Sequence, residues 1–138
     1  MNTLGGSLAV GDEMPALTLP PITRHTLALY CGASGDHNPL HTDIDNAKAA
    51  GLPDVIAHGM LSMAYLGRAL TAWVPQHRLR SYSVRFANPT QIRDVITCSG
   101  RVVEKLMVAD EPCVRIALQV RTQNDIVTLL GEAVVALA

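Results

Sequence analysis

The hydrophobic pattern of the chain changes its period once, near Pro75, and this change limits the folds open to it. From Gly59 to about Trp73, apolar residues occupy nearly every side of a predicted helix, which is typical of a helix wrapped by other structure. After Pro75, apolar and polar residues alternate along Tyr82–Phe86 and Val114–Val120, which predicts half-covered strands. A sheet with one apolar face needs a cover, and this helix is the long apolar element available. We therefore predict an α+β fold in which a curved antiparallel sheet wraps around one long central helix.

Two further strands and three separators complete the prediction for the second half. The strands are expected at Ile92–Glu104 and Ile126–Leu137. The separators are Asn88-Pro89, the connection Lys105–Pro112 and a hairpin turn at Gln123–Asp125. Consecutive strands joined in this way predict an antiparallel meander.

The first half is expected to contain shorter elements. In chain order these are a strand at Leu17–Leu19, a helix capped by Thr23 and ended at Gly32, a turn-rich loop at Ala33–His41, and a short helix at Ala47–Ala50 that Asp43 or Asp45 caps and that Gly51 and Pro53 end. No internal repeat or linker-like segment interrupts the pattern. Residues 1–138 are therefore expected to form one domain.

Composition narrows the range of partners. The formal net charge of the 138 residues is −1, so we expect neither nucleic acid nor an acidic membrane surface as a partner. Hydrophobic residues make up 49% of the chain and charged residues only 17%, which indicates surface hidden by self-association. The most apolar stretch, Val55–Gly67, falls short of the roughly 20 residues that a membrane span requires.

Cysteines and the N-terminal segment indicate the cellular compartment. The three cysteines, Cys31, Cys98 and Cys113, are widely spaced and form no CxxC pair, so we expect small buried hydrophobes rather than disulfides or a zinc site. Met1–Gly11 has no basic region followed by an apolar stretch, so we expect no secretory signal there. A cytoplasmic location follows as the expectation.

Chemically capable residues gather in two short segments. Asp36, Asn38 and His41 lie in the turn-rich loop, and His58-Gly59 opens the apolar helix. A carboxylate and an imidazole held by a rigid turn can share acid and base work, because histidine titrates near neutrality and burial can tune an aspartate toward it. Backbone N–H groups at the start of a helix can stabilise an oxyanion, and a glycine there lets a carbonyl approach closely.

A longer motif connects the two segments. It reads Tyr30-x-x-x-Ser34-Gly35-Asp36-x-Asn38-Pro39-x-His41-x-Asp43, followed by Ala47, Gly51, Ile56, His58, Gly59 and Met60. This motif resembles the signature of the MaoC-like (R)-specific enoyl-CoA hydratases and (3R)-hydroxyacyl-thioester dehydratases. The resemblance implies a hot-dog fold across almost the whole chain.

The resemblance also implies a reaction and roles for particular residues. The reaction is the reversible hydration of trans-2-enoyl thioesters to (3R)-3-hydroxyacyl thioesters. Asp36 and His41 match the catalytic pair, and Gly59 matches the amide that binds the thioester oxygen. Asn38 matches a residue that orders the loop and the catalytic water, and Ser62 matches one that contacts the catalytic pair. From helical spacing, we expect Leu27, Tyr30, Met63 and Leu66 to line the acyl site.

The expected partner is a small-molecule thioester, and other interpretations of the site remain open. The substrate would be acyl-CoA or acyl-carrier protein, and no cofactor or metal is required. Asp36 alone would suggest an Asx turn beside a glycine. Metal binding by His37, His41 and His58 matches no known ligand spacing. His58 itself is expected to be structural, bonded to the loop backbone, and His37 is expected either to perturb the catalytic pair or to face solvent.

Two other functional classes are open to the same fold. A thioesterase would place a carboxylate on the central helix, but Gly59–Trp73 contains no Asp or Glu. An acyl-binding or structural subunit of a heteromeric dehydratase would lack the catalytic pair, which this chain keeps. Because relatives of this size pair their sheets edge to edge, we expect a homodimer or a higher oligomer of dimers, with a heterodimer as the other possibility.

Overall fold

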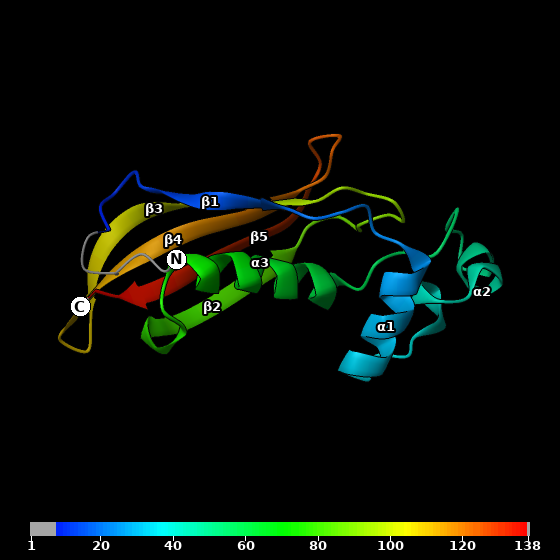
Figure 1. The fold of residues 1–138 in the computed structure, drawn as a ribbon, viewed down its shortest axis with the longest axis horizontal. Helices are drawn as coiled ribbons and strands as arrows, with labels where there is room; N and C mark the ends of the chain where they lie inside the picture. Colours follow the sequence, from blue (N-terminus) through cyan, green and yellow to red (C-terminus); the bar gives the residue numbers. More distant parts are fainter. Residues whose placement is uncertain (1–7, 138) are drawn as a thin grey trace.

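One long helix lies along one face of a five-stranded antiparallel sheet in the computed structural model, which describes residues 8–137 (Figure 1). The helices are α1 (Arg24–Ser34), α2 (Ile44–Ala49) and α3 (Gly59–Trp73), with short 3₁₀ helices at Pro39–His41 and Gln76–Arg78. The strands are β1 (Glu13–Thr18), β2 (Leu79–Phe86), β3 (Thr97–Val108), β4 (Glu111–Arg121) and β5 (Val127–Ala136). This arrangement confirms the predicted α+β class and the hot-dog architecture. The expectation about a secretory signal falls mostly on residues outside the described range.

The main hydrophobic core fills the space between α3 and the sheet. Leu66, Leu70 and Val74 are fully buried on the helix side. On the sheet side the buried residues alternate along the strands, at Val114, Ile116, Leu118 and Val120 in β4 and at Leu129, Ala133 and Val135 in β5. Each fully buried side chain of this size contributes roughly 1.5–3 kcal/mol to folding. The period-two prediction for β4 is therefore confirmed.

A second, smaller core holds the first half of the chain against the start of α3. Leu27 of α1, Ala47 of α2 and Leu61 of α3 are buried there together with Ile22 and Val55. In Figure 1, α1 and α2 lie beyond the end of the sheet, away from the C-terminus. This cluster brings the loop between α1 and α2 next to the first turn of α3.

The sheet order is β1-β3-β4-β5-β2, so the prediction of a meander is only partly right. β3, β4 and β5 follow one another as neighbours, but β2 pairs with β5 at the far edge. The segment between β2 and β3 crosses from one edge of the sheet toward the other. It is held on the way by the bridge between Ile56 and Gln91 and by the bond from the Arg93 N–H to the Ile22 carbonyl.

The predicted bounds of the third strand are wrong at both ends. β3 begins at Thr97 rather than Ile92, because Arg93 has a φ of +69° and interrupts an extended backbone. It continues through the predicted connection to Val108, where Ala109 and Asp110 have φ values of +48° and +65°. Two consecutive residues with positive φ form a tight hairpin turn, for which Asn-Gly is the usual sequence. Ala109-Asp110 is not such a sequence, so the pattern predicted a longer connection.

The first helix also ends later than predicted. α1 continues past Gly32 to Ser34, and Gly35 takes the left-handed conformation with a φ of +76°. Its N–H donates to the carbonyl of Cys31, which closes the helix. Thr23 is the N-cap, as predicted, and its hydroxyl accepts from the N–H of Thr26.

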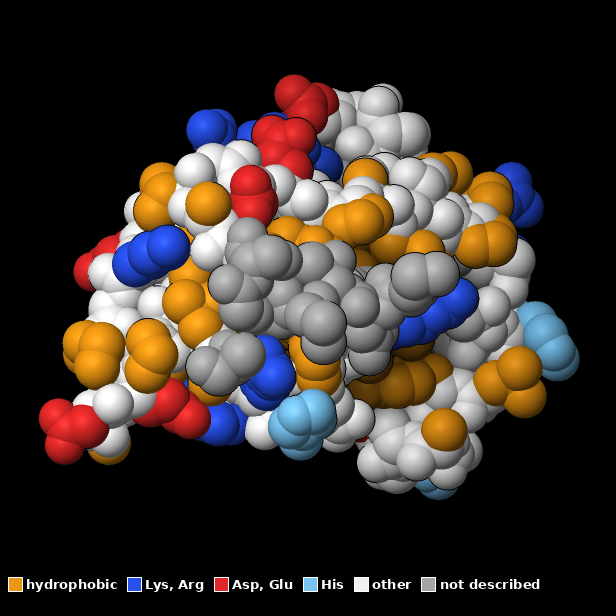
Figure 2. Space-filling model, turned by 60° about the vertical axis from the view of Figure 1, so that its left-hand side comes forward, with side chains coloured by type: hydrophobic (Ala, Val, Ile, Leu, Met, Phe, Trp, Pro, Cys, Tyr) orange, Lys and Arg blue, Asp and Glu red, His pale blue; other side chains and the backbone are white. Residues whose placement is uncertain are grey.

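The burial of the three cysteines agrees with the sequence analysis. Cys31, Cys98 and Cys113 are buried and unpaired, and burial raises the pKa of the Cys98 thiol to about 12. The face shown in Figure 2 carries hydrophobic side chains beside charges of both signs. Among the described helices, none has the length and apolar character needed to cross a membrane. The cytoplasmic location stays a prediction.

One hydrogen bond joins the edge strand β2 to α3 and can be tested. The Tyr82 hydroxyl donates to the carbonyl of Met63 at 2.6 Å, and burial raises the pKa of Tyr82. Tyr82→Phe should lower the free energy of unfolding by about 0.5–1.5 kcal/mol, measured by urea denaturation. Tyr65→Phe is the control, because the Tyr65 hydroxyl has no hydrogen-bond partner within residues 8–137. Equal stability of Tyr82→Phe and the wild type would contradict this assignment.

Candidate active site

The loop after α1 is held by a relay of side-chain to backbone hydrogen bonds. The Ser34 hydroxyl accepts from the N–H of Asp36 at 3.1 Å, and Asp36 Oδ1 accepts from the N–H of Asn38 at 3.2 Å. Asn38 Oδ1 in turn accepts from the N–H of Leu40 at 3.0 Å and caps the 3₁₀ helix that carries His41. Asn38 thus orders the loop, as the resemblance implied. Asp36 does form an Asx turn, but with only one of its two carboxylate oxygens.

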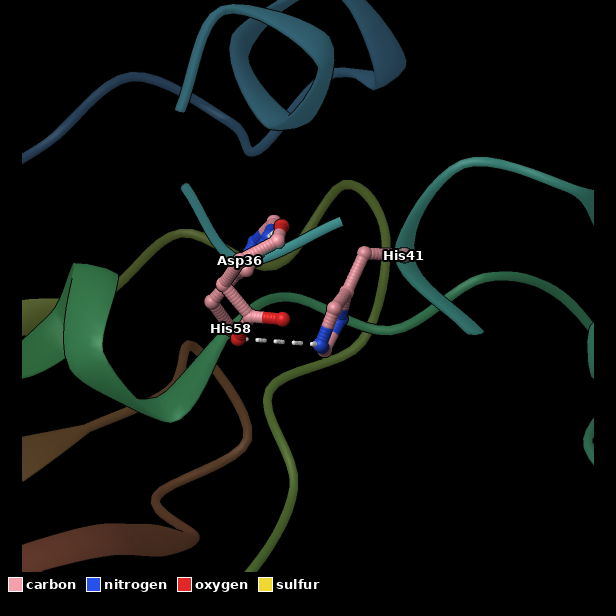
Figure 3. A group of neighbouring side chains, drawn as sticks. All are labelled: Asp36, His41 and His58. Atoms are coloured by element: carbon pink, nitrogen blue, oxygen red, sulfur yellow. Dashed lines mark hydrogen bonds and ion pairs between the residues drawn. The ribbon is translucent and has the colours of Figure 1, made fainter. Parts of the chain in front are cut away.

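The other oxygen of Asp36 faces His41. Figure 3 shows the two side chains pointing toward each other, and Asp36 Oδ2 lies 3.9 Å from His41 Nε2. That separation is too long for a direct hydrogen bond. The Asp36 side chain is half exposed, whereas only 11% of the His41 side chain is exposed. The predicted pair is therefore brought together, with the carboxylate on the solvent side.

A contact with a backbone carbonyl shows which ring nitrogen of His41 carries the hydrogen. His41 Nδ1 lies 2.7 Å from the carbonyl oxygen of Ile56. A carbonyl only accepts, so we assign a hydrogen to Nδ1. In the neutral ring Nε2 then carries a lone pair, directed toward Asp36. The geometry leaves His41 Nε2 free to accept a proton.

His58 lies directly behind this pair. Its ring stacks on His41 with centroids 3.7 Å apart and an interplanar angle of 21°, and Tyr30 meets it edge-on at 4.9 Å. His58 Nε2 lies 3.2 Å from the carbonyl oxygen of Asp36 and 3.4 Å from Cys31 Sγ. The residue is 1% exposed. Burial lowers the pKa of His58, and His41 lowers it further, while the Asp36 carbonyl opposes the shift. As expected, His58 bonds to the loop backbone.

Gly59 presents an open amide next to the pair. It is the first residue of α3, and its N–H has no backbone acceptor within the described part of the chain. Gly59 is exposed, and a Cβ at this position would lie 2.8 Å from two ring atoms of Phe86. A side chain is therefore excluded unless Phe86 moves. The free N–H at the positive end of a helix suits an oxygen that gains negative charge.

A cavity of about 470 Å³ opens at Asp36, His41 and Gly59. Its other lining residues are Ile56, Ala57, Met60, Phe86, Ala87, Asn88, Pro89, Thr90 and Leu129. Most of these are apolar. Ile56, Ala57 and Met60 come from the start of α3 and the residues before it, and the others come from the end of β2, the segment that follows it and the start of β5. Ile56 and Met60 stand in the motif, but sequence reasoning missed the lining residues 86–90 and Leu129, because the Asn88-Pro89 segment indicated only a turn and no local spacing links it to the motif.

The predicted acyl lining is wrong for Leu27 and Leu66 and stays a prediction for Tyr30 and Met63, neither of which lines this cavity. Leu27 and Leu66 are fully buried in separate cores and cannot face an open cavity. Met63 packs partly buried against the main core, and Tyr30 contacts His58 instead. The four residues were chosen from the spacing along single helices, whereas the cavity is built where distant segments meet.

Ser62 and His37 lie outside the immediate site. The Ser62 hydroxyl is buried and lies 3.5 Å from the Thr90 hydroxyl, so its link to the cavity is Thr90 rather than Asp36 or His41. His37 is exposed, and no hydrogen bond or ion pair of its side chain occurs among the described residues. Of the two alternatives for His37, the structure supports a solvent-facing side chain.

The site is better arranged for hydrogen bonding than for a metal ion. Asp36, His41 and His58 each offer a ligand atom within 4.8 Å of the others. The stacked rings of His41 and His58, however, direct their in-plane lone pairs side by side rather than toward one point. One nitrogen of each ring also already bonds a backbone carbonyl. The expectation that no metal is required stays a prediction.

Burial of His58 predicts a pH-dependent stability. The lowered pKa means that the unfolded chain takes up a proton near pH 6.5 that the folded chain resists, so stability should fall as the pH falls below that value. The titratable groups facing His58 are His41, Asp36, Tyr30 and Cys31. Urea denaturation between about pH 7.5 and about pH 5.5, a window above the ordinary carboxylate pKa values, measures this slope.

The variant His58→Gln should flatten this slope, because its amide stays neutral throughout. His25→Gln, which changes an exposed histidine of α1, is the control and should leave the slope unchanged. An identical slope in His58→Gln and the wild type would contradict the prediction.

A family model and several known proteins match the chain. The family model described as MaoC like domain matches residues 9–124. Subunit beta of the fatty acid synthase of Saccharomyces cerevisiae is 29% identical over 143 residues, covering 96% of this chain and 6% of that protein. The 3-hydroxyacyl-thioester dehydratase X of Mycobacterium tuberculosis is 43% identical over 77 residues, covering 51% of this chain and 27% of that protein. The chain thus spans a small part of the length of these curated relatives.

One solved structure matches this chain over most of the length of both proteins. The R-hydratase PhaJ1 from Pseudomonas aeruginosa matches with a TM-score of 0.81 and 32% sequence identity, over 99% of this chain and 86% of that one. The family match spans the loop of Asp36 and His41, all of α3 and most of the sheet. The chain therefore belongs to the MaoC-like domain family.

Proposed function

We propose that this protein catalyses the reversible hydration of trans-2-enoyl thioesters to (3R)-3-hydroxyacyl thioesters. The observation that carries the proposal is the convergence of Asp36 Oδ2, His41 Nε2 and the Gly59 N–H on one largely apolar cavity. Relatives named hydratase and dehydratase support the reaction class. The Asp/His mechanism and the stereochemistry are part of the proposal.

The catalytic pair would hold and activate the water. Two acceptors 3.9 Å apart are spaced so that one water molecule can donate a hydrogen bond to each. His41 Nε2 takes a proton from this water as its oxygen attacks C3 of the enoyl group. The pair then delivers a proton to C2 from the same side. The net result is OH on C3 and H on C2, and dehydration uses the same groups in reverse.

The amide of Gly59 would stabilise the charge that develops on the substrate. Attack at C3 gives the thioester oxygen enolate character, and a donor placed where that charge appears lowers the barrier. The start of α3 adds a positive potential. The thioester itself acidifies the α-carbon, so the proposed mechanism uses neither a metal nor a cofactor.

The acyl group would occupy the apolar part of the cavity, along Ile56, Phe86 and Leu129. Its thioester would be carried by coenzyme A or by a carrier protein. We also propose that the protein functions as a dimer or a larger assembly of dimers. Within the described residues, β1 and β2 form the two edges of the sheet, and an unpaired strand edge readily pairs with another chain.

Incubation of the purified protein with crotonyl-CoA separates the functional classes. Loss of the absorbance of the enoyl thioester without release of free thiol means hydration, release of free thiol means the thioesterase alternative, and neither signal means a missing partner subunit or another substrate. The absence of a carboxylate from α3 argues against hydrolysis. Size-exclusion chromatography of the same sample gives the oligomeric state.

Asp36→Asn and His41→Ala should each lower kcat by roughly two to four orders of magnitude, because each removes an acid–base group. Both residues lie outside the two cores, so circular dichroism should show that both variants keep the fold, while His41→Ala also loses the bond to the Ile56 carbonyl and the stacking on His58. His37→Ala, in the same loop, is the matched control with unchanged turnover. Wild-type rates in either catalytic variant would refute the assigned roles.

Gly59→Ala should lower kcat/KM by about 10- to 100-fold. Its methyl group would displace the ring of Phe86 and crowd the amide that binds the thioester oxygen. The fold should tolerate the change, because the side chain of Phe86 is exposed and can rotate away. Gly32→Ala on α1 is the control, since a Cβ there meets no atom within 4 Å. Initial rates of crotonyl-CoA hydration test the pair, and equal kcat/KM in both variants would contradict the role of Gly59.

A further inference from the structure

We propose that His58 is a positioning residue whose neutral imidazole holds Asp36 and His41 at the separation that hydration requires. The inference rests on the proposed function and deepens it. It starts from the position of His58, which contacts both members of the pair and is itself almost inaccessible to substrate.

The first contact fixes the backbone of Asp36. The carbonyl of Asp36 can only accept, so His58 Nε2 carries the hydrogen at 3.2 Å. The same N–H lies 3.4 Å from Cys31 Sγ, which ties the donor to the last part of α1. The carboxylate sits on a loop and is half exposed, and this bond anchors its main chain to the start of α3.

The second contact fixes the ring of His41. Stacking on His58 sets the plane of the His41 imidazole, and the bond from His41 Nδ1 to the Ile56 carbonyl sets its rotation within that plane. Tyr30 contacts the ring of His58 edge-on and limits its movement. Together these contacts aim His41 Nε2 at Asp36.

Neutrality of His58 is part of the role. His41 takes a proton during the proposed reaction, and a second charge 3.7 Å away would oppose it. With the hydrogen on Nε2, the Nδ1 atom of a neutral ring is a buried acceptor without a hydrogen-bond partner among the described residues. No acidic side chain contacts Nδ1 there to favour its protonation. The other titratable groups around the ring are His41, Asp36, Cys31 and Tyr30.

A pair of substitutions separates the two contacts. His58→Gln keeps a neutral N–H donor but loses the flat ring, whereas His58→Phe keeps the ring but loses the donor. Each should lower kcat for crotonyl-CoA by about 10- to 100-fold, because small displacements of reacting groups carry costs of this size. KM should stay within about twofold of wild type, because His58 does not line the cavity.

His25→Gln and His25→Phe, at an exposed position of α1, are the matched controls. Urea denaturation establishes that every variant is folded at the assay temperature. Wild-type kcat in both His58 variants, or a change confined to KM, would overturn the proposal.

An NMR measurement tests the proposal without turnover. Long-range ¹H–¹⁵N spectra of the wild-type protein at about pH 7.5 should show His58 as the neutral form with its hydrogen on Nε2. A hydrogen on Nδ1 at neutral pH would overturn the proposal.

The same spectra distinguish a failure of the positioning role of His58 from a failure of the proposed function. If the wild type hydrates no enoyl thioester, the proposed function fails. The positioning role is then judged by the resonances of Asp36 and His41. Shifts in both His58 variants, but not in the His25 controls, would support it, and unchanged resonances would overturn it.

Discussion

The helix α3 packs against two hydrophobic cores at once, and the position of the site depends on this double contact. Leu66 and Leu70 bury its later turns against the sheet, while Leu61 buries its first turn against α1 and α2. A helix held at both places cannot slide or tilt without opening one of the cores. Its first amide, at Gly59, is consequently fixed where the two cores meet.

The loop that carries Asp36 and His41 is held beside the start of α3 by backbone hydrogen bonds more than by side-chain packing. Gly35 ends α1 in a left-handed conformation, and Asp36 and Asn38 each satisfy a backbone N–H two residues ahead. A loop satisfied in this way can keep a half-exposed carboxylate in place. Asp36 therefore serves both as a turn former and as a candidate catalytic group, with one oxygen for each role.

Much of the fold was predictable because packing against one face leaves a periodic signature. The alternation in β4 and the apolar character of α3 both survive in the structure as buried residues. The errors occur where a conformation has no compositional signal. The left-handed Arg93 is held by the bond from its N–H to the Ile22 carbonyl, and the tight turn at Ala109-Asp110 is held by the pairing of β3 with β4. The place of β2 beside β5 likewise depends on a crossing segment with no pattern of its own.

The sequence by itself determined the chemical groups of the site, because Asp36, His41 and Gly59 stand in a motif whose local turns and helix start are set by neighbouring residues. The tertiary structure alone decided their surroundings. It stacked His58 on His41, placed Phe86 beside Gly59 and brought the end of β2, the segment after it and the start of β5 to the cavity. Contacts between residues this far apart in the chain depend on how the two cores close around α3, and no local pattern of residues encodes that.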